Sequence, residues 1–529
     1  MCHFKRSKVI WLAMLCAASI RIPPADAADS NPSAGPPPQE PHWHLFLDDH
    51  SITRSTGFQR VVHQPKPRGI ILEGSRPWDQ SRGVTPLYVG RRKQGGYEMY
   101  YRAHGNLGSV PAYAISEDGL RWEKPDLHLV DTPWGKANNL LPCKHPRDMF
   151  LHGNVRDPAK RFAFCMDTRV KNGIYFTSET PDFVNDPQAV DKLKDSGGYL
   201  GSNHNSLEFW DDINNEWVAM RQAPNHGPVR CAGRYASPDL LKWRLNHYLY
   251  PDAHDSTDPR YFDEVYGLLS IHREGFVLGF AYWFIGDRTD PDPKFYKSFG
   301  RHTTDEGLIG KGVSRGTMEV RLVVSRDGCK TWDRTVSREA WIPHGKEQDS
   351  YDRVVRIDCP PVYRNDEDWF YCSGYDGDHA NEFYHDRPTN NIYGTLYTQK
   401  HNRYVSLRAG NVGQILITKP IEVTGKTLQL NVDASHGEVT VAVGIDKWMR
   451  HKTGQWKFEA NLPHWMVRDR WERSHLEKGF QFEDCIPIRD DSTRKDVKFT
   501  NANFETLRGK TVRLYIRVQD ANLYGFRFL

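Results

Sequence analysis

The sequence predicts an all-β protein in which a five-bladed β-propeller is followed by a C-terminal β-sandwich. Four short segments repeat one pattern, in which Ser, an acidic residue and an aromatic follow a β-like run: SEDGLRW (116–122), SETPDF (178–183), SPDLLKW (237–243) and SRDGCKTW (325–332). The first three closing aromatics are evenly spaced, at positions 122, 183 and 243. A repeat at fixed spacing indicates that one supersecondary unit recurs along the chain. Repeats that consist of several β-strands are typical of propeller blades.

Strand-like runs flank these turns and divide the chain into five units. Each unit shows alternating or continuous apolar residues interrupted by turn residues. The expected strands lie at 95–103 and 110–116, at 161–167 and 173–178, at 206–222 and 230–237, at 265–284 and 318–325, and at 359–377 and 391–399.

After residue 403 the pattern changes to short alternating strands separated by turn residues, which favours a β-sandwich over residues 403–529. The expected strands lie at 404–410, 413–423, 427–434, 438–445, 511–518 and 524–529. We therefore expect the propeller to occupy residues 42–402, preceded by a Pro-rich linker over residues 28–41.

The N-terminus has the features of a signal peptide over residues 1–27. A basic start at Lys5, Arg6 and Lys8 precedes an apolar stretch over 9–20, and Ala25-Asp26-Ala27 offers a cleavage site of the small-x-small type. The apolar stretch is too short to span a bilayer, which needs about 20 residues. We expect a secreted or periplasmic protein with no membrane span.

Charge and cysteine usage exclude some classes of partner and cofactor. The 71 basic and 67 acidic side chains leave a net charge of +4, which argues against nucleic acid as the main partner. The seven cysteines after residue 27 lack CxxC spacing, and no HExxH or DxDxDG motif is present, so we expect no cofactor and no metal ligands. The sequence leaves open whether a structural calcium ion binds in the central channel. It also leaves open the oligomeric state.

The acidic residues of the repeated turns, such as Asp118 and Asp327, have two interpretations. In the structural one, Ser and Asp side chains bond the turn backbone while the aromatic packs between strands. In the functional one, the carboxyl is catalytic. We favour the structural interpretation because these turns are expected on the outer hairpins of blades.

The segment SRDGCKTW resembles the Asp-box of sialidase-like propellers, although Cys329 stands where their Gly usually is. The chain as a whole resembles the five-bladed arabinanase, levansucrase and invertase superfamily, and in particular exported planctomycete-type proteins described as family 32 or 43 glycoside-hydrolase-like. The segments that carry this resemblance are LFLDDHSI (45–52), HQPKP (63–67), RPWD (76–79), YAISEDGLRWEKPDL (113–127), LEFWDDINNEWVAMRQ (207–222), EVRLVVSRDGCKTW (319–332), GYDGDH (374–379) and EDCIPIRDDSTR (483–494). The resemblance implies a glycan substrate bound where the inner strands of the propeller converge.

The chain departs from the superfamily at the first blade. Its members typically carry an Asp on the inner strand of blade one, a second Asp in blade two and a Glu as general acid, but the segment GVTPLYVG (83–90) has no carboxylate. Asp157 in VRDP matches the invertase Arg-Asp-Pro, yet the segment also fits a hairpin turn, which we favour.

Glycoside hydrolysis needs two carboxyl groups, one ionised and one protonated. The catalytic candidates are the carboxyl residues expected at the starts of inner strands or at blade entrances, namely Glu319, Asp352, Asp263 and Glu264. In this hypothesis Glu319 protonates the leaving oxygen and one of the other three activates water. A structural ring of salt bridges with Arg321, Arg353 and Arg356 would look the same in the sequence.

Further residues are candidates for binding the substrate. Asn203 and His204 are placed to bond a sugar hydroxyl or to fill a polar core site. Arginines near the blade entrances would favour a carboxylated or sulfated glycan, against surface solvation as the alternative. These entrance arginines are Arg76, Arg82, Arg221, Arg230 and Arg234. Trp78 and Tyr375 are stacking platforms or buried packing residues. The full set is His204, Asn203, Arg76, Trp78, Arg82, Arg221, Arg353, Arg356, Asp358, Tyr375 and His379.

The sequence therefore favours an exported glycoside hydrolase that acts on a polysaccharide or oligosaccharide. The missing blade-one carboxylate favours the alternative, a glycan-binding propeller without catalysis. A propeller that serves as a scaffold for protein partners is a third possibility, and it would need a large exposed apolar patch.

Overall fold

The computed structural model describes residues 42–141, 209–287, 316–379, 391–445 and 476–529 with short gaps, together with three strands between residues 162 and 198. Residues 36–529 form one compact unit. The described elements are strands apart from one 3₁₀ turn, η4 (Phe504–Leu507), which confirms the prediction of an all-β protein. Within this part of the chain, no helix has the length and apolar character needed to cross a bilayer.

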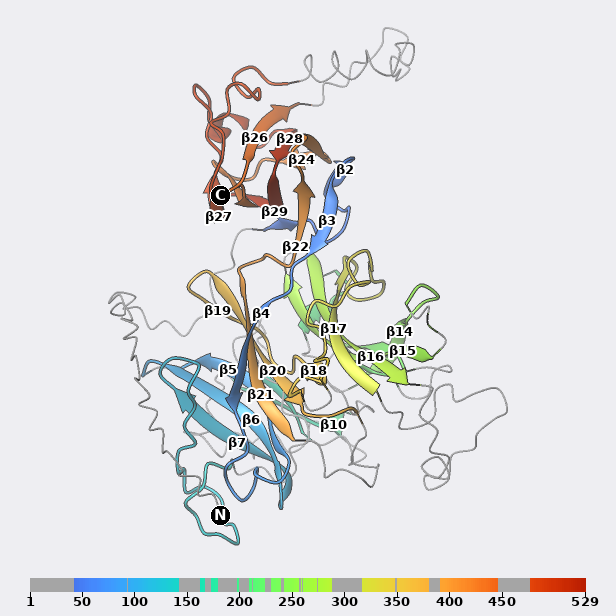
Figure 1. Ribbon diagram of the computed structural model, residues 1–529, viewed down its shortest axis with the longest axis vertical. Coiled ribbons are helices and arrows are strands. Elements are labelled where there is room, and N and C mark those ends of the chain that lie inside the picture. Colours follow the sequence, from blue (N-terminus) through green and yellow to red (C-terminus); the bar gives the residue numbers. More distant parts are fainter. Residues whose placement is uncertain are drawn as a thin grey trace, which may run out of the picture. The chain divides into compact units, whose positions relative to one another are not determined.

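The largest sheet has 11 strands in three antiparallel groups (Figure 1). The first group is β5 (Gly83–Arg91), β6 (Tyr97–Gly105) and β7 (Gly108–Ser116), and the second is β15 (Tyr261–Arg273), β16 (Phe276–Asp287) and β17 (Gly316–Ser325). The third is β18 (Val354–Arg356), β19 (Val362–Arg364), β20 (Glu367–Tyr375), β21 (Ile392–Lys400) and β4 (Lys66–Leu72), in which β4 comes from far earlier in the chain and pairs with β21.

Two further sheets lie between the first and second groups in the sequence. One has three strands, β8 (Phe162–Met166), β9 (Gly173–Ser178) and β10 (Gly197–Gly198). The other has four strands, β11 (Phe209–Asp211), β12 (Glu216–Gln222), β13 (Ala232–Ser237) and β14 (Arg244–Leu249).

The three groups of the large sheet are joined by two parallel contacts at strand beginnings. Met318 of β17 pairs with Val354 of β18, and Ile392 of β21 pairs with Gly83 of β5. The second contact requires glycine, because a Cβ on Gly83 would lie 1.9 Å from the Ile392 carbonyl oxygen and its φ is +99°. These contacts bring the first residues of several strands to the same region.

Strands of the large sheet are buried on both faces, which explains their continuous apolar sequences. All ten residues of β17 are buried, whereas β4, at the edge of this sheet, and β14, at the edge of the four-stranded sheet, are largely exposed or half-buried. Lys66 and Pro67 on β4 are residue types that protect a sheet edge from pairing with another chain.

The strands after residue 403 form two sheets that share one apolar core. A six-stranded sheet contains β1 (His44–Leu45), β3 (Gln59–Val62), β22 (Val405–Ala409), β25 (Leu428–Asp433), β27 (Asp491–Asp496) and β29 (Ala521–Phe528). A five-stranded sheet contains β2 (Ile52–Arg54), β23 (Gln414–Thr418), β24 (Ile421–Glu422), β26 (Glu438–Gly444) and β28 (Thr511–Gln519). Their common core includes Leu407, Leu416, Leu430, Val441, Leu514 and Phe526.

The first described strands belong to these C-terminal sheets. β1 pairs with β29, β2 with β23 and β3 with β22. This pairing differs from the expectation that residues 42–402 form the propeller alone, because segments more than 300 residues apart had to be matched and neither carries a local signal for the other.

Two of the repeated turns have the structural role that their sequence predicts. The Ser325 hydroxyl accepts a hydrogen bond from the Cys329 backbone N–H at 2.8 Å, and Asp327 accepts those of Lys330 at 3.0 Å and Thr331 at 2.9 Å. Asp118 likewise accepts from the backbone N–H groups of Leu120 and Arg121. The carboxyls are therefore used within their own turns.

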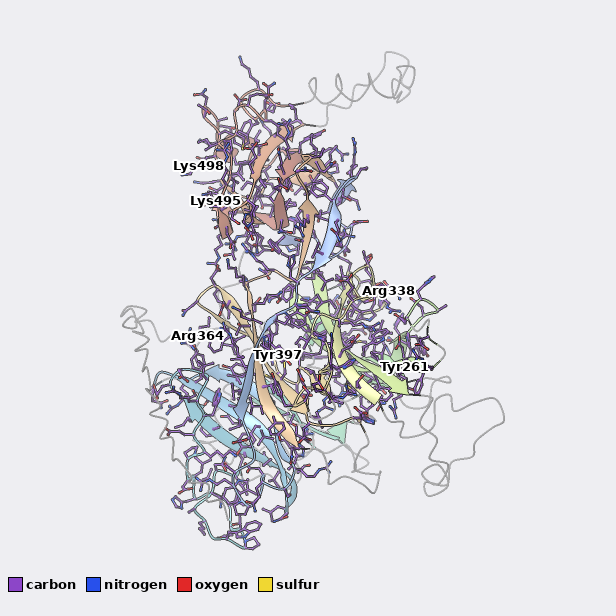
Figure 2. All side chains as sticks on the ribbon, in the orientation of Figure 1. Tyr261, Arg338, Arg364, Tyr397, Lys495 and Lys498 are labelled. Atoms are coloured by element: carbon purple, nitrogen blue, oxygen red, sulfur yellow. The ribbon has the colours of Figure 1, made fainter. Side chains whose placement is uncertain are left out.

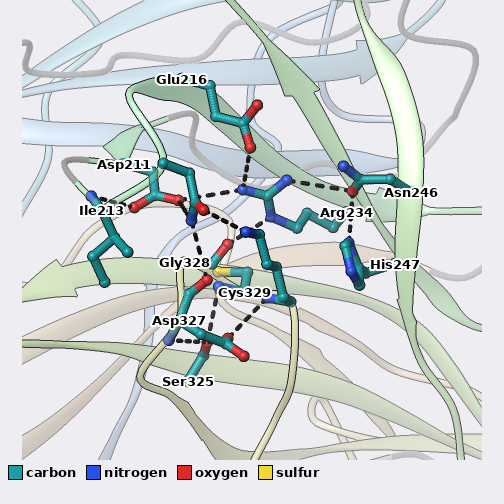
Figure 3. Close-up of polar contacts among 12 residues, drawn as sticks. Asp211, Ile213, Glu216, Arg234, Asn246, His247, Ser325, Asp327, Gly328 and Cys329 are labelled. Atoms are coloured by element: carbon teal, nitrogen blue, oxygen red, sulfur yellow. Dashed lines mark hydrogen bonds and ion pairs between the residues drawn. The ribbon is translucent and has the colours of Figure 1, made fainter.

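The turn at Ser325 also holds the β11–β14 sheet through a buried arginine (Figure 3). Arg234 is fully buried, donates from Nε to the Gly328 carbonyl oxygen at 2.6 Å, and pairs with Glu216 at 2.8 Å and Asp211 at 3.3 Å. Glu216 also binds Arg244, whose side chain is 65% exposed.

Replacing Arg234 should therefore destabilise the fold much more than replacing Arg244. We expect Arg234→Met to lower the free energy of unfolding by about 3–5 kcal/mol, because two buried carboxylates lose their common partner. Arg244→Met, the control on the same glutamate, should cost about 0–1 kcal/mol, as exposed pairs do. Urea unfolding of both variants measures this, and equal effects would contradict the stabilising role of Arg234.

Candidate functional site

A cluster of arginine, tyrosine and histidine side chains lies where several strands begin or end. On the first group, Arg82 immediately precedes β5, and its carbonyl oxygen accepts the Ile392 backbone N–H at 2.7 Å. Arg102 and His104 lie near the end of β6, where the His104 ring is within 3.0 Å of the Thr85 hydroxyl and 2.9 Å of the Ser109 hydroxyl.

Electrostatic effects show that these residues meet others from the third group. Burial lowers the pKa of His104 well below its ordinary value, and the charges of Arg102, Arg82 and Arg356 act in the same direction. Burial raises the pKa of Tyr375, and the same three arginines oppose this shift. His104 is therefore neutral, and three cations act on it: Arg82 just before β5, Arg102 on β6 and Arg356 on β18.

The third group adds an ion pair and an aromatic ring. Arg356 pairs with Asp358 at 3.3 Å, and its guanidinium carbon lies 5.7 Å from the centre of the Tyr375 ring. The Ser373 hydroxyl also donates to Asp358. Arg356 and Asp358 each keep about 12% of their side chain exposed.

The second group contributes Glu264 and Tyr266 from β15. Glu264 accepts the Arg230 backbone N–H at 3.0 Å and pairs with its guanidinium at 3.0 Å. The Arg230 guanidinium carbon lies 4.9 Å from the centre of the Tyr266 ring, and the Tyr266 hydroxyl is 3.0 Å from His379 Nε2.

These residues form one assembly because their charges act on one another across groups. Burial raises the pKa of Tyr266, while Arg230 and Arg356 lower it. We call the set the strand-end cluster; it consists of Arg82, Arg102, His104, Arg230, Glu264, Tyr266, Arg356, Asp358, Tyr375 and His379.

Glu319 and Asp263 lie in a different network from Glu264. Glu319 is on β17, the third strand of its group, and accepts a hydrogen bond from Arg321 Nε at 2.7 Å. Asp263 precedes Glu264 on β15, and adjacent residues of a strand point to opposite faces. The structure therefore separates Glu319 and Asp263 from the strand-end cluster.

This second network is buried around Trp283. The guanidinium carbons of Arg321 and Arg334 each lie 4.7 Å from the centre of the Trp283 ring. Arg321 also approaches Asp255 at 3.6 Å, and Asp255 is paired with Arg334 at 2.5 Å and with Arg338 at 2.8 Å. Arg338 is labelled in Figure 2.

Asp263 is the least satisfied member of this network. Its Oδ2 atom is buried and makes no hydrogen bond within the described part of the chain. Burial raises the pKa of its carboxyl above the ordinary value of 3.8, although the Arg321 charge and the facing Trp283 indole N–H favour the ionised form without reaching hydrogen-bond geometry.

Asp352 and Arg353 lie just before β18, where their partners are local. Asp352 accepts from the Ser350 hydroxyl, and Arg353 donates to Asp378 at 2.5 Å and to the Gly345 carbonyl oxygen at 2.9 Å. The arginine pairs Arg353–Asp378, Arg356–Asp358 and Arg321–Glu319 therefore match the salt-bridge interpretation of this part of the sequence.

The remaining candidates lie apart from the strand-end cluster or outside the described residues. Trp78 is 2% exposed and donates from Nε1 to Asn139 at 2.9 Å, so it packs in the core and offers no stacking face. Arg76 lies between β4 and β5 and donates to the Lys124 carbonyl oxygen at 3.3 Å. Arg221 is fully buried on β12, and Asn203, His204 and Asp157 lie outside the described residues.

Sequence reasoning missed Arg102, His104 and Tyr266 as site residues and named Arg230 only as an entrance arginine. A signal was present in YYRAHG, where Arg102 and His104 alternate with small residues at the end of an apolar strand. Tyr266 gave no signal, because a tyrosine within an apolar run reads as core.

No group of three or more His, Cys, Asp or Glu side chains that could hold a metal ion occurs within the residues that the structure describes. Cys231, Cys329, Cys359, Cys372 and Cys485 are buried free thiols.

Comparison with known proteins gives distant structural likeness only. No family model matches the chain, and no curated protein matches it. Solved structures that align include a protein titled glycoside hydrolase, with 11% identity and a TM-score of 0.36, over 64% of this chain and 92% of the other. An α-L-arabinofuranosidase from Podospora anserina in complex with cellotriose aligns with 11% identity and a TM-score of 0.36, over 64% and 98%.

An N-acetylgalactosamine deacetylase from F. plautii, in complex with blood group B trisaccharide, aligns with 12% identity and a TM-score of 0.33, over 69% of this chain and 95% of the other. All three TM-scores lie below 0.5.

Asp263 should make stability depend on pH in a specific direction. Because its native pKa is raised, the native state binds more protons than the unfolded state, and the free energy of unfolding falls as pH rises from 3.8 through the native value. We expect Asp263→Asn to raise the thermal unfolding midpoint at pH 7, with the gain disappearing below about pH 3.8.

Asp118→Asn is the control of opposite sign. The pKa of the Asp118 carboxyl lies below its ordinary value. Partial burial raises this pKa, but hydrogen bonds from the backbone N–H groups of Arg121 and Leu120 outweigh burial and lower it. This variant should lose stability at pH 7, and the loss should fade as the pH falls below the ordinary value of the carboxyl. A gain for Asp118→Asn, or none for Asp263→Asn, would contradict the assignment of the two environments.

Proposed function

We propose that the strand groups are the five blades of a propeller and that the C-terminal sheets form a β-sandwich. The three groups of the 11-stranded sheet and the separate three- and four-stranded sheets make five units, and β4 completes the last of them. The core shared by the two C-terminal sheets is the arrangement expected of a sandwich. We take the boundaries 42–402 and 403–529 as part of this proposal, with β1, β2 and β3 contributed to the sandwich.

We propose that the chain is an exported glycoside hydrolase and that its substrate binds at the strand-end cluster. The observation that carries this proposal is that Glu264, Asp358, Tyr375 and several arginines lie where strands of different groups begin or end, and that the charges of these arginines act across the groups. Propeller ligands bind where inner strands converge, and glycosidases use two carboxyl groups beside the scissile bond. In this proposal Glu264 and Asp358 supply the acid and the base.

The cations of the cluster favour an anionic glycan. The positive charges of Arg82, Arg102 and Arg356 lower the pKa values of the same two side chains, His104 and Tyr375. The guanidinium group of Arg230 lies over the Tyr266 ring. Guanidinium groups bind carboxylate and sulfate in a bidentate manner, so polysaccharides with uronic acid or sulfate groups are the first substrates to test.

A non-catalytic glycan-binding protein is the second candidate. Both carboxyls of the cluster are held by arginines, Glu264 by Arg230 at 3.0 Å and Asp358 by Arg356 at 3.3 Å. Such pairs can position the arginines for binding without taking part in hydrolysis. Retention on a glycan in affinity electrophoresis without release of reducing ends would favour this function.

Release of reducing ends from a panel of neutral, uronic and sulfated polysaccharides tests the proposed hydrolase. We expect cleavage of an anionic member, and a loss of at least about 10²-fold in kcat for Glu264→Gln, because the isosteric amide cannot exchange a proton. Glu117→Gln, at a side chain that is 87% exposed, is the matched control and should keep full activity. Full activity of Glu264→Gln would remove this residue from the mechanism.

A further inference from the structure

We infer that Tyr266 and His379 form a proton-transfer pair for β-elimination on a uronate residue of the glycan. This inference rests on the proposed glycan site and assigns it a second reaction, in which a glycan that contains uronate is cleaved without water. The protein would then also act as a polysaccharide lyase, through a histidine base and a tyrosine acid.

The pair is built in the geometry that proton transfer requires. The Tyr266 hydroxyl and His379 Nε2 are 3.0 Å apart, within the range for proton exchange between side chains. The two rings lie with centres 5.2 Å apart, and Phe284 packs against His379 at the same distance. A hydrogen bond from the His379 backbone N–H to the Gly316 carbonyl oxygen, at 2.7 Å, fixes the segment that carries the histidine.

The protonation states suit the two roles. Burial raises the pKa of Tyr266, so the phenol keeps its proton at neutral pH and can donate it. In the His379 tautomer that carries its proton on Nε2, this nitrogen donates to the phenolic oxygen and Nδ1 is left to accept a proton. His379 is half-buried whereas Tyr266 is buried, so the histidine is the more accessible member.

Cations flank the pair where a uronate carboxylate would need them. The Arg230 guanidinium lies over the Tyr266 ring at 4.9 Å and also 5.5 Å from the centre of the Phe284 ring, and the charge of Arg356 acts on Tyr266. A guanidinium bound to the carboxylate of the sugar stabilises the negative charge that develops when the neighbouring C5 proton leaves.

The reaction balances without any further reactant. His379 Nδ1 takes the C5 proton, the C4–O bond breaks as the C4=C5 double bond forms, and the leaving oxygen takes the Tyr266 phenol proton. The Nε2 proton of His379 then passes to the phenolate across the 3.0 Å hydrogen bond, and His379 keeps the proton taken from C5. No oxidation occurs, and no carboxyl group is consumed as acid or nucleophile.

The two carboxyl groups of the strand-end cluster are paired with arginines, and these pairs agree with this chemistry. Glu264 and Asp358 hold Arg230 and Arg356, which orients the guanidinium groups.

Digestion of polygalacturonate, alginate and chondroitin, together with the neutral and sulfated polysaccharides of the panel above, in ¹⁸O-labelled water tests the inference with the full chain. We expect cleavage of a uronate polymer with ultraviolet absorbance from the new C4=C5 bond conjugated to the carboxylate, and no ¹⁸O in the products. Cleavage with ¹⁸O incorporation and no absorbance would overturn the inference while supporting the proposed hydrolase. Cleavage of neutral or sulfated glycans that lack uronate, and of no others, would also overturn the inference. Cleavage of no glycan at all would overturn both the inference and the proposed hydrolase.

Variants then assign the roles. Tyr266→Phe keeps the ring and should lower kcat at least about 10²-fold with little change in KM, and His379→Gln should do the same. A packing role for Tyr266 predicts instead a lower unfolding midpoint with unchanged kcat, which would overturn the assignment. Glu117→Gln serves again as the matched control.

Discussion

The close backbone contact between β21 and β5 is the constraint on which the candidate site depends. Gly83 leaves room for the Ile392 carbonyl oxygen, which a Cβ would approach to 1.9 Å, and the Ile392 N–H binds the Arg82 carbonyl oxygen at 2.7 Å. The second parallel contact, Met318 with Val354, joins the start of β17 to β18, the strand that carries Arg356. Strand beginnings from three groups are thereby held together, and the side chains that follow them meet.

Several arginine side chains are buried or half-buried in this fold, and their positive charges have to be compensated. Buried arginines are costly unless they are paired and hydrogen-bonded. Arg234 is compensated by Glu216 and Asp211, and Arg321 by Glu319. Arg230 and Arg356 have carboxylate partners too, but 19% and 12% of their side chains stay exposed, against none for Arg234 and 9% for Arg321. In our account Arg230 and Arg356 are the arginines that face a ligand.

Much of the strand content could be predicted from the sequence because apolar periodicity is local. The expected strands at 95–103 and 110–116 correspond to β6 and β7, and those at 265–284 and 318–325 to β15, β16 and β17. Glu319 shows where this reasoning ends. From the sequence, its carboxylate could meet either a substrate or an arginine, and in the structure Arg321, two residues along the same strand, pairs with it. The pairing of β1, β2 and β3 with strands after residue 403 escaped prediction because the partners lie more than 300 residues apart. Trp78 was ambiguous, because its partner Asn139 lies 61 residues away.

The central claim is that the strand-end cluster binds an acidic sugar. A crystal structure of the protein with a bound oligogalacturonate tests it most directly. Our account predicts a uronate carboxylate within hydrogen-bond distance of Arg230 or Arg356, with the sugar ring beside Tyr375 or His379. A saccharide bound elsewhere on the protein, with the cluster filled only by its own side chains and water, would contradict it.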